Sequence, residues 1–186
     1  MKDIVEVELF VKELLTEERY NHSVDVKNKA VELAKLYGED ERIVSLVGIA
    51  HDLAKEIPTK EKIQYCEKNN IIIDEIERIN PELLHGKIGK DISIKKLGFT
   101  EDMGNAIEYH TTGKKGMNNL AKIIFVADSI AEDRNWNGIE EGRKLARKNL
   151  DEAVLYFLNR TIEYVLEKKE YIHINSIELR NQYLTK

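Results

Sequence analysis

Apolar residues recur at helical spacing along most of the chain. The first such segment covers residues 4–15. The second covers residues 17–37 and is followed by Gly38, a typical C-terminal stop. The third, from about residue 40 to 54, is so apolar between Ile43 and Leu53 that we expect it to form the buried centre of a helical bundle.

Helical spacing continues to the end of the chain, with one ambiguous stretch. Thr59, directly after Pro58, is the predicted N-cap of the next helix. Residues 71–80 are ambiguous, because three consecutive isoleucines favour a strand whereas the residues after them favour a short helix. The other predicted helices cover residues 59–66, 81–85, 86–97, 100–110, 120–130, 140–149 and 150–169 and a last amphipathic piece after 176.

The length of the chain, its few Gly and Pro residues and the lack of a linker predict one domain. The chain has 186 residues, with ten Gly and two Pro, and shows no repeat, linker or low-complexity segment. Two domains of half this length would each have a small core. We therefore expect an all-α fold in which residues 1–186 form a single domain.

Charge and composition exclude several classes of protein. The net charge of −5, from 29 Lys plus Arg against 34 Asp plus Glu, argues against a nucleic-acid binder, which normally has a basic excess. Cys66 is the only cysteine, so no intrachain disulfide is expected. The acidic N-terminal segment does not resemble a signal peptide, and no apolar run has the length of a membrane span. A cytoplasmic location without membrane association is the expectation.

Candidate chemistry centres on the adjacent pair His51 and Asp52 at the end of the third apolar segment. Neighbouring side chains on a helix point about 100° apart, so this pair needs partners from other helices to surround a metal. Four residues near the ends of, or inside, other apolar segments are candidates: His22, His85, His110 and Asp128.

Two observations favour a metal site over isolated structural histidines. Imidazole and carboxylate at this ratio suit iron, manganese, cobalt or zinc, and suit calcium badly. Asp128 interrupts a strongly apolar helix, where an unpaired carboxylate would cost several kcal/mol. The alternative for each histidine alone is a hydrogen-bonded structural residue, and His-Asp adjacency also arises by chance.

Five short motifs surround the candidate ligands: Arg19-Tyr20-Asn21-His22-Ser23, Ala50-His51-Asp52-Leu53-Ala54-Lys55, Leu84-His85-Gly86, Tyr109-His110-Thr111-Thr112-Gly113, and Val126-Ala127-Asp128-Ser129-Ile130 followed by Arg134. In this order they resemble the HD-domain metallophosphohydrolases, in the branch with two extra histidines that binds a pair of metal ions. More narrowly they resemble the bacterial YqeK family, a symmetrical bis(5'-nucleosyl)-tetraphosphatase. The resemblance spans about residues 17–140.

The resemblance implies a division of ligands. One metal would be held by His22, His51, Asp52 and Asp128, and the second by His85 and His110, with Asp52 bridging the two. A bridged pair binds both the attacking and the leaving oxygens of a phosphoryl transfer. The chain departs from the family pattern at one place, because Ala131-Glu132 stands where the family usually has Glu-Pro. Either the carboxylate has slipped by one position or the local turn differs.

Substrate contacts are expected from Lys55 and Arg134, whose cationic groups suit phosphate oxygens, and from Thr111 and Gly113, which offer a hydroxyl and a close backbone approach. Lys55 alone would otherwise be a solvated helix-end charge. Trp136 is a candidate for stacking on adenine, although a loop tryptophan covering the core edge is more common. His173 has no family counterpart and is interpreted as a surface or packing residue.

The predicted function is metal-dependent cleavage of diadenosine tetraphosphate to two ADP, with Asp52, Lys55 and Arg134 as catalytic residues. The expected cofactor is two divalent metal ions, iron in the cell, with manganese, cobalt or zinc as alternatives. One alternative keeps the metal centre but acts on a nucleoside phosphate or a cyclic nucleotide. Another is a non-catalytic nucleotide-sensing module, which the complete ligand set disfavours. A homodimer is left open.

Overall fold

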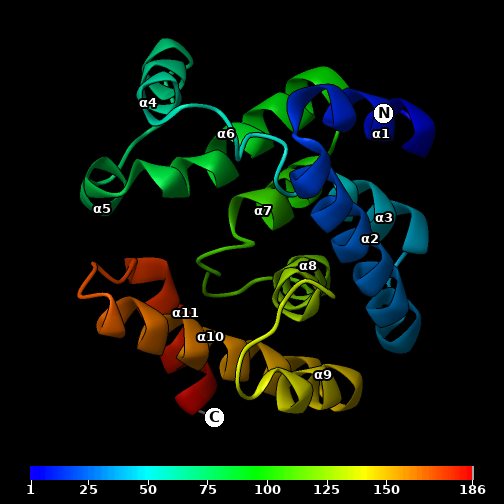
Figure 1. The fold of residues 1–186 in the computed structure, drawn as a ribbon, viewed down its shortest axis with the longest axis vertical. Coiled ribbons are helices and arrows are strands. Elements are labelled where there is room, and N and C mark those ends of the chain that lie inside the picture. Colours follow the sequence, from blue (N-terminus) through cyan, green and yellow to red (C-terminus); the bar gives the residue numbers. More distant parts are fainter. Residues whose placement is uncertain (186) are drawn as a thin grey trace.

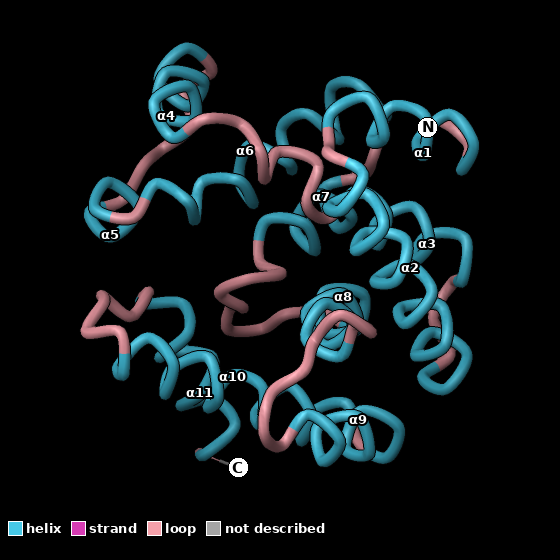
Figure 2. Tube along the Cα trace, viewed as in Figure 1, coloured by secondary structure: helices cyan, strands magenta, loops and turns pink. Residues whose placement is uncertain are grey.

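The computed structural model describes residues 1–185, which form helices joined by short loops (Figure 1). No strand occurs within this range, so the predicted all-α class is confirmed (Figure 2). In chain order the elements are α1 (Ile4–Leu14), α2 (Glu17–Tyr37), α3 (Glu41–Ala50), α4 (Thr59–Lys68), α5 (Glu75–Ile79), η1 (Pro81–Leu83), α6 (Leu84–Ile92), η2 (Ser93–Leu97), α7 (Glu101–Glu108), α8 (Asn119–Ile130), α9 (Ile139–Lys148), α10 (Leu150–Glu167) and α11 (Ile174–Leu184).

The helices pack around α3 and α8. The last seven residues of α3 are buried except Ser45, and α8 buries residues on nearly all sides. α2 packs on both, α7 lies against α6 and α8, and α10 joins α8 to α9 and α11. Figure 1 accordingly places α8 near the middle of the molecule. Among the described residues, none of the helices is both long and apolar enough for a membrane crossing.

The ends of α2 follow from its sequence. The Thr16 side chain accepts a hydrogen bond from the Arg19 amide at the N-terminus, and Gly38 adopts a left-handed φ of 73° at the C-terminus. Both are the standard devices for beginning and ending a helix. The prediction of a helix over residues 17–37 is confirmed.

The prediction that the third helix continues to Ala54 is wrong. α3 ends at Ala50, and the next residues form tight turns in which the Leu53 amide donates to the Ala50 carbonyl and the Lys55 amide donates to the Asp52 carbonyl. The His51 ring bonds to the Gly48 carbonyl at 2.8 Å, so a side chain takes an acceptor that a continued helix would use. The segment that contains His51, Asp52 and Lys55 therefore lies in turns at the helix end rather than on the helix.

Two smaller expectations are also settled. Thr59 is the first residue of α4 rather than its cap, because its hydroxyl donates to Glu82 at 2.8 Å. In the ambiguous stretch the helix prevails over the strand. α5 begins after Asp74, which forms a capping box with Glu77.

A glycine sets the distance between α6 and α7. A Cβ on Gly86 would lie 2.5 Å from the Glu108 carbonyl oxygen at the end of α7, so only glycine permits this approach. Gly104 in α7 is different. A Cβ there would meet the Cδ1 of Ile94 and the Cγ of Lys90, at 2.9 Å each, which are side-chain rather than backbone atoms.

We predict that Gly86→Ala lowers the free energy of unfolding by about 1 to 3 kcal/mol, the usual cost of overpacking. Gly104→Ala, the matched control, should be near neutral, because helix propensity gains up to about 1 kcal/mol against a small side-chain shift. Urea unfolding of both variants measures the difference. Equal stability of the two variants would contradict the backbone contact as the constraint.

Candidate metal centre

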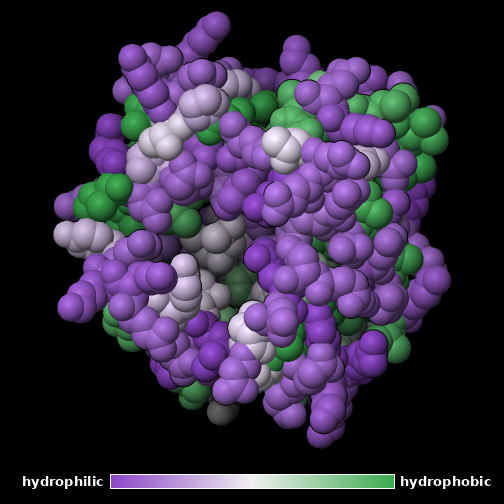
Figure 3. Space-filling view, viewed as in Figure 1, coloured by the Kyte–Doolittle hydropathy of each residue, from purple (hydrophilic) through white to green (hydrophobic). Residues whose placement is uncertain are grey.

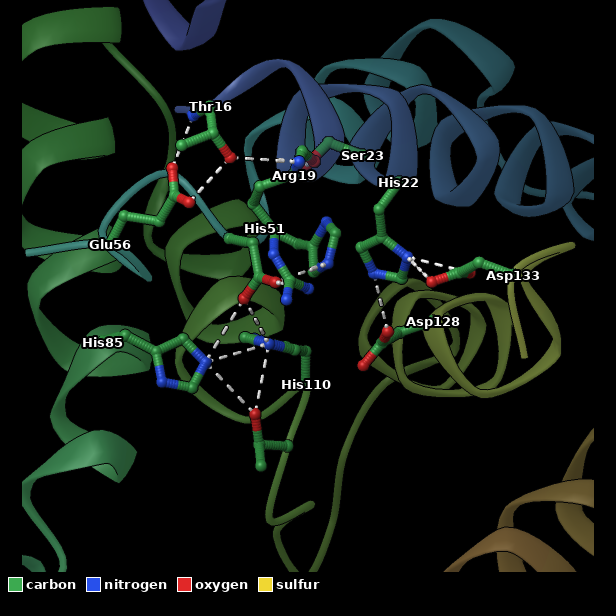
Figure 4. Close-up of polar contacts among 12 residues, drawn as sticks. Thr16, Arg19, His22, Ser23, His51, Glu56, His85, His110, Asp128 and Asp133 are labelled. Carbon is green, nitrogen blue, oxygen red and sulfur yellow. Dashed lines mark hydrogen bonds and ion pairs between the residues drawn. The ribbon is translucent and has the colours of Figure 1, made fainter. Parts of the chain in front are cut away.

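The six candidate ligands come from five places in the fold and converge. His22 lies on α2, His51 and Asp52 directly follow α3, His85 lies on α6, His110 follows α7, and Asp128 lies on α8. Figure 4 shows the four imidazoles and Asp128 pointing toward one another. The closest pairs are His22 Nε2 and Asp128 Oδ1 at 3.1 Å, His85 Nε2 and His110 Nε2 at 3.2 Å, Asp52 Oδ1 with His110 Nε2 at 3.3 Å and with His85 Nε2 at 3.4 Å, and Asp52 Oδ2 with His51 Nε2 at 3.6 Å.

Three of the histidines share one backbone contact. Each places its Nδ1 against the carbonyl three residues earlier. A carbonyl oxygen only accepts, so each Nδ1 carries the proton and each Nε2 presents a lone pair to the centre. The carbonyls are those of Gly48 for His51 (2.8 Å), Glu82 for His85 (2.5 Å) and Ile107 for His110 (2.7 Å).

The centre contains more acceptors than donors. His51 Nε2 and Asp52 Oδ1 are buried without a hydrogen-bond partner anywhere in residues 1–185. The Thr111 hydroxyl lies 3.3 Å from His85 Nε2 and 3.1 Å from His110 Nε2, but it has one proton for two lone pairs. Unpaired buried acceptors that face one another are costly, and a divalent cation satisfies them together. The residues present therefore fit a metal.

Burial keeps these imidazoles in the form that binds metal. It lowers the pKa of His51 to about 4 and, with the nearby His110, the pKa of His85 to about 3, so both are neutral at pH 7. For Asp128, burial works to raise the pKa, but His22 and Arg134 together hold it below its usual range. Neutral imidazoles beside ionised carboxylates are the ligand forms that divalent metals require.

Asp133 is a residue of the site that sequence analysis did not identify. Both of its carboxylate oxygens lie 3.0 Å from His22 Nδ1, while His22 Nε2 faces Asp128. Burial opposes protonation of His22, yet the two carboxylates raise its pKa. A carboxylate that accepts the Nδ1 proton leaves Nε2 free for a metal and strengthens it as a ligand.

The loop that departs from the family pattern explains this contact. Glu132 points to the outside and pairs with Lys29 at 2.5 Å, so it does not occupy the place of a slipped carboxylate. Asp133 faces His22 instead. Because Asp133 lies in an exposed loop, no hydrophobic periodicity marks it in the sequence. The only sequence feature that pointed to this loop was the replacement of the family's Glu-Pro by Ala131-Glu132.

Two further groups support the predicted ligands. The Arg19 guanidinium lies 3.2 Å from Asp52 Oδ2, which gives a role to a residue of the first motif that had none. Lys62 is almost completely buried, with 1% of its surface exposed, and donates to Glu82 at 2.6 Å. Since the Glu82 carbonyl holds His85, the buried lysine anchors the turn that orients this imidazole.

The four predicted substrate contacts lie in different surroundings. Arg134 donates from Nη2 to Asp128 Oδ1 at 2.6 Å and from Nε to the Asp128 carbonyl, which leaves Nη1 available. Lys55 is half-buried and close enough to His85 to affect its pKa, and its ammonium forms no ion pair within residues 1–185. Thr111 touches the imidazoles as described. Gly113 turns with a φ of 64° against Leu179 of α11.

Trp136 and His173 are both packed. Trp136 is half-buried and stacks on Tyr156 with ring centroids 6.3 Å apart. His173 is buried, N-caps α11 and bonds to Asp74 at 3.0 Å, far from the six converging ligands in sequence.

The helical fold, together with the four histidines and two aspartates that converge in it, indicates the protein family. Residues 19–133 match the HD domain family. The chain belongs to the HD domain family, and the resemblance seen in its motifs is confirmed.

Within that family the chain is similar to proteins named symmetrical bis(5'-nucleosyl)-tetraphosphatase. It is 37% identical to the one from Bacillus subtilis over 161 residues, 86% of each chain. It is also 37% identical to the one from Halalkalibacterium halodurans over 175 residues, covering 94% of this chain and 93% of that protein. A crystal structure from Clostridium acetobutylicum, described as a predicted HD superfamily hydrolase involved in NAD metabolism, superposes with a TM-score of 0.95 at 36% identity and covers 100% of this chain and 98% of the other.

We predict that Asp133→Asn weakens binding of Mn²⁺ by about 10- to 100-fold, the usual effect of losing a partner behind a ligating histidine. Glu132→Gln, one residue away, should bind like wild type, because Glu132 contacts only Lys29. Calorimetric titration of Mn²⁺ into chelator-treated protein measures both. Equal affinities in all three proteins would show that Asp133 does not act through His22.

Acid should destabilise metal-stripped protein. Between pH 6.5 and about 4, His51 and His85 take up protons in the unfolded chain but not in the folded one. The unfolded state then binds more protons, so the free energy of unfolding falls by up to about 1.4 kcal/mol per pH unit for each histidine. His22, with its raised pKa, acts in the opposite direction only above about pH 6.5, because below that pH it is protonated in both the folded and the unfolded state. Urea unfolding at pH 7 and pH 5 should therefore show a smaller loss in His85→Gln than in wild type, and an identical loss would contradict this assignment.

Proposed function

We propose that the protein is a metal-dependent hydrolase that cleaves diadenosine tetraphosphate symmetrically into two ADP. The observation that carries the proposal is the set of buried, unpaired acceptors around Asp52, which fits metal ions at a place open to a cleft. Membership of the HD domain family and the names of the relatives support the substrate.

The geometry around Asp52 supports a bridging role for this residue. Its Oδ1 faces His85 and His110, whereas its Oδ2 faces His51. His22, His51 and Asp128 place ligand atoms within 4.8 Å of one another, and so do His51, Asp52 and His110. We assign His22, His51, Asp52 and Asp128 to one metal and His85 and His110, with Asp52, to the other. Iron is the metal we propose, with manganese, cobalt or zinc as alternatives that the same imidazole and carboxylate ligands also suit.

The remaining roles belong to the chain's own cationic and polar groups. When bound, the metal ions supply positive charge at the central phosphates and lower the pKa of a water molecule. Arg134, held on Asp128, offers Nη1 to a phosphate oxygen, and Lys55 carries an ammonium whose charge acts on His85. Both offset charge that grows on phosphate oxygens during the reaction. The Thr111 hydroxyl orients toward His85 and His110 from the floor of the cleft.

We also infer that residues 140–186 complete one domain with the HD region. α10 packs on α8, and the Tyr37 hydroxyl on α2 donates to the Ala146 carbonyl on α9 at 2.7 Å. These contacts support a single unit over residues 1–185; the last residue of the predicted range, 186, lies outside the described residues.

The test is steady-state cleavage of diadenosine tetraphosphate by metal-loaded protein, with products separated by chromatography. Wild type should form ADP alone. AMP plus ATP would reject symmetric attack, and binding of the dinucleotide without any cleavage would favour a nucleotide-sensing module. Cleavage of a nucleoside phosphate or cyclic nucleotide in its place would reject the substrate but keep the hydrolase.

Lys55→Ala should lower turnover by about 30- to 1,000-fold with metal content unchanged, since it removes one charge contact that strengthens in the transition state. Lys60→Ala, an exposed lysine at the start of α4, is the control and should retain wild-type turnover. Metal content is quantified in every sample. A Lys55→Ala protein with normal turnover would remove Lys55 from the mechanism.

A further inference from the structure

A cleft of about 530 Å³ opens from the candidate metal centre and extends along α10. Its inner part includes His110, Asp128 and Arg134, and its wall continues to Tyr164 and Glu167 on the last turns of α10. Figure 3 shows this face of the molecule hollowed near its middle, beside the region that α8 and α10 occupy in Figure 1. The volume lies within the range of small-molecule sites.

One face of α10 forms the wall. Phe157, Arg160, Tyr164 and Glu167 line the cleft and follow one another at intervals of three or four residues, which places them on the same side of the helix. From Phe157 to Glu167 this face is about 15 Å long, at 1.5 Å per residue. The cleft therefore extends well beyond the phosphate-sized space around the metal ligands.

The wall is aromatic. The Trp136 and Phe157 rings meet edge to face at a centroid distance of 6.1 Å, and both line the cleft. Tyr164 is 58% exposed, and the Lys168 ammonium lies 5.5 Å from the centre of its ring. An exposed ring at the rim of a cleft offers a stacking surface to a planar ligand.

Charge gives the cleft a direction. The inner end carries Arg134, which attracts phosphate, together with His110 and Asp128, two of the ligands that would hold a phosphate-binding metal cation. At the outer end Arg160 is neutralised by Glu163 at 2.7 Å, and the carboxylate of Glu167 and the ammonium of Lys168, neither of which forms an ion pair within the described chain, offset each other in net charge. An anionic ligand end therefore belongs inside, and an uncharged planar end that can donate hydrogen bonds belongs outside. A purine nucleoside 5'-phosphate has this polarity.

We propose that this cleft is the subsite for one purine nucleoside of the dinucleotide, with the base stacked on Tyr164 and its exocyclic amino group directed to the carboxylate of Glu167. This assignment rests on the proposed function for the identity of the substrate. It makes Tyr164 a specificity residue that contacts the base and has no part in holding metal.

The chain carries its own reporter for this subsite, because Trp136 is the only tryptophan and lines the cleft. ADP added to metal-loaded protein should change the Trp136 emission in a saturable way. Pyrophosphate, which lacks a base, should bind with heat in calorimetry but leave the emission unchanged. Binding of ADP without any change in Trp136 emission would overturn the assignment.

Variants separate stacking from folding. Tyr164→Ala should lower the affinity for ADP on the order of 10- to 100-fold, because one aromatic stacking contact is lost. The affinity for pyrophosphate should be unchanged. Tyr164→Phe should keep wild-type affinity. Tyr171→Ala, an equally exposed tyrosine of the loop between α10 and α11, is the control and should have no effect.

The outcomes distinguish this proposal from the proposed function. If Tyr164→Ala lowered the affinities for ADP and for pyrophosphate equally, or lowered neither, the proposed subsite would be overturned. Cleavage of diadenosine tetraphosphate with an unchanged KM in Tyr164→Ala would overturn the subsite and leave the hydrolase standing. Tyr164-dependent ADP binding in a protein that cleaves no dinucleotide would keep the subsite and reject the hydrolase.

Discussion

The hydrogen bond from a histidine Nδ1–H to the carbonyl three residues earlier, made by His51, His85 and His110, determines the character of the centre. It fixes the tautomer, so every Nε2 lone pair faces inward, and it uses the only proton that a neutral ring has to donate. Asp52 adds oxygens to the same space. The folded chain thereby creates a strongly negative local potential that favours a bound cation. Arg19 compensates only part of it, because its guanidinium contacts only Oδ2 of Asp52.

The rest of the fold keeps these lone pairs close. Gly86 lets α6 approach the end of α7, which brings His85 to His110. Lys62, although buried, stabilises the turn that carries the Glu82 carbonyl. Burying an ammonium is costly unless it is paired. Because Lys62 lies behind His85, the cost of burying its ammonium supports the orientation of a metal ligand rather than the packing of the core.

The sequence predicted the helices well where their ends are marked by local chemistry. Thr16 and Gly38 bound α2 at the predicted residues. The end of α3 was wrong, because apolar periodicity does not reveal that the His51 ring would take a helix carbonyl. The convergence of the ligands was expected partly from histidines near the ends of separate apolar segments and an aspartate within an apolar helix, and chiefly from the resemblance of the motifs to a known family. Asp133 and Arg19 were not, since a loop carboxylate and a helix-end arginine look like ordinary solvated charges until their partners are known.

The ligands are also widely separated along the chain: Asp128 follows its partner His22 by 106 positions. During synthesis from the N-terminus, His22, His51, Asp52, His85 and His110 all precede α8, so a nascent chain lacks one wall of the centre until α8 has emerged. Contacts between residues this far apart also form late, because a long loop must close first. A cation that needs all six ligands would therefore bind only after α8 has been made and has packed, so metal binding would follow the formation of these helices rather than start it.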